Sequence, residues 1–354
     1  MNIRTVNTTS PKAQPDWNNL GFGVYYTDHM LMIDYAAGKG WHDARIVPYG
    51  PLSMDPSAMV LHYAVEIFEG LKAYATPDGK IKMFRPYDNA KRLNVSAARF
   101  CMPDLPVDDF MDSICSLIKL ERAWVPKEEG TSLYIRPFMY SDQPNVGVRI
   151  PELFKFVVIL SPVGAYYKEG INPVSIYVED EYVRAAKGGT GYTKCGGNYA
   201  ASLIAQKKAS DMGCTQVLWL DGAERKYIEE VGTMNVIFKI NGEIVTPELS
   251  DSILAGITRD SVLTLLRHWD YKVSERKISK DELFNAAESG ALEEAFGTGT
   301  AAVISPIGLF DINGKKIPVN NGKIGPVAQK LYDTITGIQW GKIPDPFGWT
   351  YEVI

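Results

Sequence analysis

Apolar and polar residues alternate in many short runs along the chain, and such alternation predicts β-strands with one buried face. In the first half the predicted strands are 22–35, 41–51, 71–74 and 81–84, together with the largely apolar runs 132–139 and 154–160. In the second half they are 174–178, 215–220, 301–309 and 315–319. Two turns join neighbouring runs: Pro77-Asp78-Gly79 predicts one hairpin, and Asn241-Gly242 within 234–245 predicts another.

Other stretches repeat their apolar residues at helical spacing. They predict helices over 58–68, over 106–119, after a cap at Asn89, after residue 199, after Gly256, from the capping box 279–282, and over 327–336. Residues 164–173 are rich in Gly and contain Pro173, which is typical of a linker. The pattern predicts an α/β protein of the α+β type with two domains, 1–163 and 175–354, joined by an interdomain loop at 164–174.

Composition narrows the class of protein. The 354 residues are 45% hydrophobic and 22% charged, as in an ordinary globular protein, and the net charge of -5 argues against nucleic acid or an anionic membrane as the main partner. No run of about 18 apolar residues and no N-terminal signal segment are present. The four cysteines and four histidines show no metal-ligand spacing, so no metal site is expected.

The stretch 188–199 carries Lys194 among five glycines. One interpretation is a flexible surface loop with a solvated lysine. The other is a lysine held close to a ligand, whose desolvated amine becomes a nucleophile toward carbonyls. A nucleotide-binding P-loop is disfavoured, because Thr193 precedes the lysine and Cys195 follows it.

A lysine that binds pyridoxal phosphate needs an anion cradle and an acid partner for the pyridine nitrogen. Residues 254–260 form a glycine-containing turn that leads into a helix, which is a suitable anion site. Residues 296–301 are a second turn of small residues. Glu229 and Glu230 stand just before a strand and offer the acid, although a solvated acidic turn is an equally good explanation of these two residues alone.

Taken together, residues 194–199, 230–235, 296–301, 68–73 and 84–86 resemble the motifs of branched-chain amino acid aminotransferases, in the same order along the chain. The resemblance implies a fold-type IV pyridoxal 5'-phosphate enzyme with a small N-terminal α/β domain and a larger C-terminal pseudo-barrel domain. It also implies a cytoplasmic homodimer that transfers amino groups reversibly between leucine, isoleucine or valine and 2-oxoglutarate by a ping-pong mechanism. A D-amino acid transaminase or an aminodeoxychorismate lyase of the same fold is the alternative, and a non-catalytic binding protein would not need the lysine.

The resemblance also implies roles for single residues. Lys194 matches the lysine that links to the cofactor, Tyr199 the partner of its ring oxygen, and Glu230 the partner of its pyridine nitrogen. The other cofactor-binding positions, mainly around the phosphate, are Arg92, Leu254, Gly256, Ile257, Thr258 and Thr300. The positions that line the substrate pocket are Phe22, Tyr63, Phe68, Tyr134, Tyr166, Thr233 and Ala301, with Arg136 for the distal carboxylate of glutamate. Ala302 and Ser305 occupy the positions of the redox cysteines of mammalian members, so thiol regulation of that type is not expected.

Overall fold

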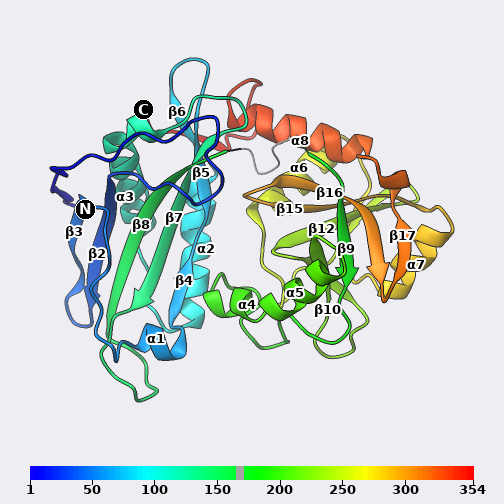
Figure 1. Cartoon of the computed structure of the whole chain (residues 1–354), viewed down its shortest axis with the longest axis horizontal. Coiled ribbons are helices and arrows are strands. Elements are labelled where there is room, and N and C mark those ends of the chain that lie inside the picture. The colour runs from blue at the N-terminus through cyan, green and yellow to red at the C-terminus, as the bar shows by residue number, and fades with distance from the viewer. Residues whose placement is uncertain (165–170) are drawn as a thin grey trace. The chain divides into compact units, whose positions relative to one another are not determined.

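The computed structural model describes residues 1–164 and 171–354, which divide into two compact units (Figure 1). The first holds 1–164, 194–196 and 337–354, and the second holds 171–193 and 197–336. The pattern of the sequence assigns the whole C-terminal end to the second domain. The end lies instead in the first unit, because the strand Thr350–Glu352 pairs antiparallel with Ile81–Phe84.

A mixed sheet forms the body of the first unit, in the order β1-β3-β2-β8-β7-β5-β6-β18, with β4 also paired to β7. Its strands are β1 Arg4–Thr5, β2 His29–Ala36, β3 Gly40–Pro48, β4 Glu66–Phe68, β5 Leu71–Ala75, β6 Ile81–Phe84, β7 Ser132–Ser141, β8 Leu153–Val163 and β18 Thr350–Glu352. Its helices are α1 Met59–Tyr63, α2 Pro86–Arg99, α3 Val107–Leu120 and the short 3-10 helix η1 Arg122–Trp124.

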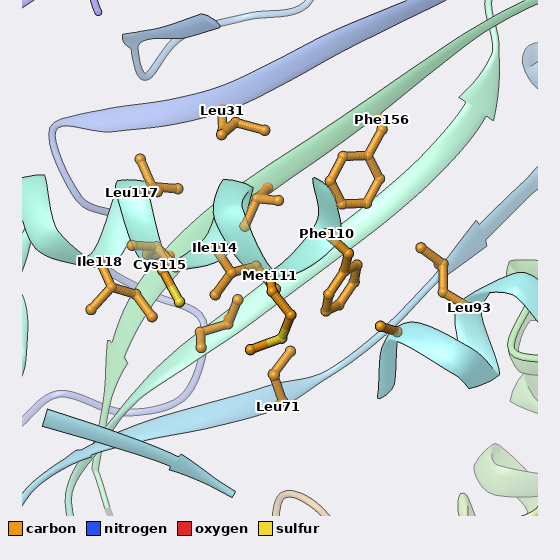
Figure 2. Packing of buried hydrophobic residues seen from close by; sticks show 14 of the residues in the cluster. Leu31, Leu71, Leu93, Phe110, Met111, Ile114, Cys115, Leu117, Ile118 and Phe156 are labelled. Atoms are coloured by element: carbon orange, nitrogen blue, oxygen red, sulfur yellow. The ribbon is translucent and has the colours of Figure 1, made fainter. Parts of the chain in front are cut away.

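The core of the first unit lies between this sheet and helices α2 and α3 (Figure 2). The helical spacing in 106–119 predicts a buried stripe, and Phe110, Ile114 and Leu117 are all fully buried. They pack with residues such as Leu31 and Phe156, which point inward from β2 and β8. Burial of these side chains removes apolar surface from water and is the main term that stabilises the unit.

The second unit is built on a closed sheet. Its strands follow the order β11-β10-β9-β16-β15-β12, and β11 pairs with β12, which completes the ring and confirms the pseudo-barrel. The strands are β9 Val174–Val178, β10 Gln216–Leu220, β11 Ile228–Val231, β12 Met234–Ile240, β13 Glu243–Thr246, β14 Val273–Glu275, β15 Leu292–Gly299, β16 Val303–Ile312 and β17 Lys315–Pro318. The helices are α4 Gly196–Ala200, α5 Leu203–Asp211, α6 Ile257–His268, α7 Lys280–Glu288, η2 Asn320–Gly322 and α8 Pro326–Gln339.

Most predicted elements are present. Asn241 and Gly242 both have positive φ in the turn between β12 and β13, as the hairpin signal requires. The Ser279 side chain accepts a hydrogen bond from the Glu282 N–H at 3.0 Å, so the predicted cap of α7 is confirmed.

Besides the assignment of the C-terminal end, four predictions were wrong. The helix over 58–68 stops at Tyr63, because Glu66–Phe68 pairs with β7 as strand β4. The first strand starts at His29, not at residue 22, since Gly23 has a φ of 69° that interrupts an extended chain. Asn89 caps no helix: α2 already begins at Pro86, a residue that suits the first helical position. Residues 296–299 form the end of β15, so the second small-residue turn comprises only 300–302.

Helix α3 allows a matched test of this core. Leu117→Ala removes a side chain that is 0% exposed and should lower the free energy of unfolding by about 2–5 kcal/mol. Leu120→Ala makes the same chemical change at a position that is 39% exposed and should change it by no more than about 0.5 kcal/mol. Urea unfolding followed by circular dichroism measures both. Equal losses for the two variants would contradict the assigned face of α3.

Candidate active site

One face of strand β7 gathers four of the predicted pocket residues. Side chains alternate along a strand, so Tyr134 and Arg136 face away from Ile135, which is in the core. The Arg136 guanidinium lies 4.6 Å from the centroid of the Phe68 ring, and its Nη2 donates a hydrogen bond to the Tyr134 hydroxyl at 3.1 Å. Phe22 packs edge-on against Tyr134, with ring centroids 5.0 Å apart. Phe22, Phe68, Tyr134 and Arg136 are called the aromatic wall below.

Two further residues shape this wall, and the sequence motifs assigned neither a role. A Cβ atom on Gly70 would fall on the Tyr134 hydroxyl, so only glycine lets that ring take its place. Lys72 lies directly opposite Tyr134 in the pairing of β5 with β7. Burial lowers the pKa of Lys72 to about 8, so its amine is less strongly protonated near neutral pH than an ordinary lysine.

One N–H donor of the Arg136 guanidinium is not used within the described chain. Its Nε is buried and makes no hydrogen bond to any residue that the structure describes. A buried donor without a partner costs free energy, so this group favours an acceptor from outside the chain. A guanidinium offers its donors as a planar fork that matches a carboxylate. The aromatic wall is therefore suited both to aliphatic side chains and to one carboxylate.

The backbone of Lys194 is fixed on both sides within the first unit. Its N–H donates to the Ser96 hydroxyl at 3.0 Å, and its carbonyl accepts a hydrogen bond from the Phe68 N–H at 2.9 Å. The Lys194 Nζ lies 4.9 Å from the centroid of the Phe68 ring. The amine is therefore placed beside the aromatic wall by main-chain contacts, and it is not on a solvated surface loop.

A buried carboxylate, Glu69, organises the surroundings of Arg92. Its oxygens accept hydrogen bonds from the Arg92 Nε at 2.7 Å and Nη2 at 2.9 Å, and from the Asn89 Nδ2 at 2.7 Å. Burial alone would raise the pKa of Glu69, but Arg92, Lys194 and Asn89 outweigh it and hold that pKa below its usual value. Glu69 stays ionised and orients Arg92, a role that the spacing of the sequence does not reveal.

The glycine-rich stretch before the lysine is also ordered. In the second unit, the Asn198 side-chain amide donates to the carbonyls of Thr190 at 2.9 Å and Thr193 at 3.0 Å. The Thr190 hydroxyl donates back to the Asn198 side chain at 2.8 Å. This network closes the loop on itself, which excludes the interpretation of a flexible surface loop.

Glu230 is buried on β11, at 3% exposure. One of its oxygens, Oε1, accepts hydrogen bonds from the Leu254 N–H at 3.0 Å and from the Asn235 side-chain amide at 3.2 Å. Its other oxygen, Oε2, lies 2.8 Å from the Arg184 Nε. These partners exclude the solvated acidic turn. The residues that line a small cavity next to this carboxylate include Tyr199, Thr233, Leu254 and Arg184.

The second unit also contains the two segments that the sequence predicts as anion sites. Helix α6 begins at Ile257 after Gly256, which has no side chain to cap it, and Thr258 is buried in its first turn. The N-terminus of such a helix attracts phosphate. The second feature is the turn 300–302 between β15 and β16, where Thr300 and Ala301 are half-buried. Val303, which follows, has a φ of 62°, a strained backbone for a β-branched residue.

Thr233 and Ala301 belong to the second unit, and two other predicted pocket residues, Tyr63 and Tyr166, are not placed in the aromatic wall either. Tyr63 is 39% exposed at the end of α1, where its hydroxyl donates a hydrogen bond to the Val146 carbonyl. Tyr166 lies outside the described residues.

Among the helices of the described chain, none is long and apolar enough to cross a membrane.

Known proteins resemble this chain over nearly its whole length. The family model for class IV aminotransferases matches residues 66–310. Branched-chain-amino-acid aminotransferase 2 of Bacillus subtilis is 57% identical, over 99% of this chain and 97% of its own length. The corresponding aminotransferase of Mycobacterium tuberculosis is 49% identical, over 98% of this chain and 96% of its own.

Solved structures of branched-chain amino acid aminotransferases are also similar to this chain. The crystal structure of the branched-chain amino acid aminotransferase of Escherichia coli has a TM-score of 0.76 at 26% identity, and the match covers 92% of this chain and 99% of that one. The T.th. enzyme of the same name, solved with pyridoxamine 5'-phosphate, has a TM-score of 0.74 at 27% identity, with 91% and 98% covered. The chain belongs to the class IV aminotransferases and, among them, to the branched-chain-amino-acid aminotransferases.

Proposed function

We propose that the protein catalyses reversible transamination between leucine, isoleucine or valine and 2-oxoglutarate, with pyridoxal 5'-phosphate as its cofactor. The observation that carries this proposal is the aromatic wall, in which apolar rings surround one arginine with an unsatisfied buried donor. Rings take aliphatic side chains, and the guanidinium takes the distal carboxylate of glutamate or 2-oxoglutarate.

The chain has the groups that this cofactor requires. Lys194 offers an amine, Glu230 offers a buried carboxylate, and the N-terminus of α6, where Gly256 provides no side-chain cap, suits a phosphate. The T.th. relative, at 26% identity, has been solved in complex with N-(5'-phosphopyridoxyl)-L-glutamate, which supports both the cofactor and glutamate as a substrate. When bound, the cofactor supplies an aldehyde that links to amines and a ring that withdraws electrons from the substrate Cα.

Each residue then has a definite task. The Lys194 amine would hold the cofactor and, once the substrate amine has taken its place, would accept the proton of the substrate Cα and return it. Glu230, held ionised by its partners, keeps the proton on the pyridine nitrogen. Arg136 and the rings around it set the substrate orientation. Release of the oxo acid and entry of the second one reverse these proton movements, which gives ping-pong kinetics.

The choice of substrate follows from the same wall. A hydrophobic pocket separates side chains that differ by one methylene by only about 1–3 kcal/mol, which suits an enzyme that accepts three aliphatic amino acids. A D-amino acid transaminase or an aminodeoxychorismate lyase would share Lys194 and Glu230. The relatives at 57% and 49% identity over nearly the whole chain favour the branched-chain enzyme over both.

We further propose that the protein is a homodimer that works in the cytoplasm. Support for a dimer comes from exposed apolar residues of the first unit around Tyr63: Leu61, Val146, Val148 and Ile150 are between 59% and 83% exposed. The Tyr63 hydroxyl ties α1 to the segment that carries Val146 and Val148. Exposed apolar residues that lie together are typical of a surface that another chain covers.

Lys194→Ala should remove the covalent link to the cofactor and nearly all transamination, because no other group then exchanges with the substrate amine. Borohydride treatment followed by mass spectrometry of the tryptic peptides measures the link directly. Lys187→Ala, at an exposed lysine just before the glycine-rich stretch, is the control and should behave as the unchanged protein. Full activity of the Lys194→Ala protein would refute the role of this residue.

Arg136→Met should impair the reaction with 2-oxoglutarate much more than the reaction with leucine. Loss of a charged hydrogen bond of about 1.5–3 kcal/mol should raise the KM for 2-oxoglutarate roughly 10- to 100-fold. The half-reaction with leucine should change much less, since no carboxylate of the leucine side chain is lost. Stopped-flow measurement of each half-reaction tests this, with the exposed Arg122→Met as control. Equal losses in both half-reactions would contradict selective binding of the distal carboxylate.

Val148→Lys should weaken the proposed dimer, because it places a charge on a residue that is 83% exposed in the single chain. Sedimentation equilibrium should show dissociation at a protein concentration at which the unchanged protein stays dimeric. Val95→Lys, at a 49% exposed position of α2, is the control. A monomeric unchanged protein, or a Val148→Lys variant that dimerises as well as the control, would remove this surface from the proposal.

A further inference from the structure

Arg184 is a buried cation next to the Glu230 carboxylate, and the proposed reaction gives it no task. Its side chain is 8% exposed, and that of Glu230 is 5% exposed. The Arg184 Nε is 2.8 Å from the Glu230 Oε2, but it is not aligned as a hydrogen bond. The contact is therefore an electrostatic pairing, and its strength grows with burial because little water screens it.

The far end of the guanidinium is anchored to the backbone. Nη2 donates to the Gly191 carbonyl at 3.2 Å and also to the Ser252 carbonyl. The chain segments that carry these two carbonyls touch, since a Cβ on Gly191 would overlap the Ser252 backbone. Glycine at 191 is required for this close approach. Arg184 thus connects the glycine-rich stretch, the segment before α6, and the Glu230 carboxylate.

A second buried carboxylate, Glu229, stands next to Glu230 on β11 and points to the opposite face of the strand. Its Oε1 accepts a hydrogen bond from the Ser252 hydroxyl, and its Oε2 has no partner among the described residues. Burial raises the pKa of Glu229, and Asp221 and Asp251 raise it further, although Ser252 and Arg184 act in the opposite direction. Arg184 thus lies near both carboxylates, and it is in direct contact with Glu230.

The partners of Glu230 divide into two kinds. Asn235 stands opposite it in the pairing of β11 with β12, and its amide together with the Leu254 N–H fixes the position of Oε1. These are neutral donors. Arg184 is the cation in contact with the carboxylate within the described part of the second unit. At 3% exposure this carboxylate has lost nearly all of its hydration, and a cation in contact with it favours the ionised form.

We propose that Arg184 is a positioning residue that keeps Glu230 ionised and oriented, and thereby keeps the pyridine nitrogen of the bound cofactor protonated. Arg184 acts through Glu230 and touches no substrate. The inference rests on the proposed function, because it assigns Glu230 to the pyridine nitrogen. It adds to that function the group that sets the charge of this carboxylate.

The test uses two substitutions that differ in charge. Arg184→Gln removes the cation, whereas Arg184→Lys keeps a cation but loses the forked geometry that bridges two carbonyls. The full-length protein is loaded with pyridoxal phosphate that carries ¹⁵N in its ring, and the ¹⁵N chemical shift reports the protonation of that nitrogen. The thermal unfolding temperature of the cofactor-free protein and the kcat and KM for leucine are measured beside it.

The proposal predicts a ¹⁵N chemical shift typical of a protonated nitrogen in the unchanged protein and in Arg184→Lys. In Arg184→Gln the chemical shift should move toward the value of the unprotonated nitrogen. Since one pKa unit corresponds to about a tenfold change in equilibrium, kcat for Arg184→Gln should fall about tenfold or more, with a smaller change in KM. Arg276→Gln, which breaks the Arg276–Glu282 pair elsewhere in the second unit, should leave the shift unchanged.

A role for Arg184 in packing alone makes a different prediction. Both Arg184 variants would then unfold at lower temperature, yet both would keep the ¹⁵N shift of the unchanged protein, and that result would overturn the proposal. An unchanged protein that binds the cofactor and shows these shifts but transfers no amino group would overturn the proposed function and leave the role of Arg184 standing. An unchanged protein that binds no cofactor would overturn both.

Discussion

Buried charge is the constraint on which the site depends. The carboxylates of Glu69 and Glu230 lie almost fully out of water, where an unpaired charge would be neutralised by a shift of its pKa. Each is matched by an arginine, Arg92 in the first unit and Arg184 in the second, and by one asparagine amide. Removing one member of such a pair leaves the other charge buried without compensation, which is why these pairs constrain their surroundings strongly. Both carboxylates therefore depend for their charge on the side chains packed around them.

In the sheet of the first unit, side chains alternate along each strand, so the polar residues of the site lie on one face and the hydrophobic core lies on the other. Ile135 and Met139 of β7 are fully buried against the helices, while Tyr134 and Arg136 stand on the other face and form part of the aromatic wall. A shift of one residue in the pairing of β7 with β8 would exchange the two faces. The core of the first unit and the aromatic wall are thus both fixed by the register of one strand.

Recognition in this wall combines two physical effects. The rings of Phe22, Phe68 and Tyr134 offer an apolar surface that discriminates weakly among aliphatic side chains. Arg136 lies over two of these rings, so its guanidinium is held by contacts with their π faces while a buried Nε remains without a hydrogen bond inside the described chain. The aromatic wall therefore has the groups that the proposed reaction needs for a hydrocarbon in one half and a carboxylate in the other.

The sequence by itself determined the local features, because they arise from neighbouring residues: the buried stripe of α3, the cap at Ser279, the hairpin at Asn241, and the motifs that single out Lys194 and Glu230. Only the tertiary structure decided features that depend on contacts between distant segments. Residues 66–68 have helical spacing but become a strand through pairing with β7, and the C-terminal residues join the first sheet through β6. The partners of the charged site residues are likewise set by packing: Glu69 pairs with Arg92, and Arg184 pairs with Glu230. The spacing of residues in the sequence does not predict which distant charges pair in the folded chain.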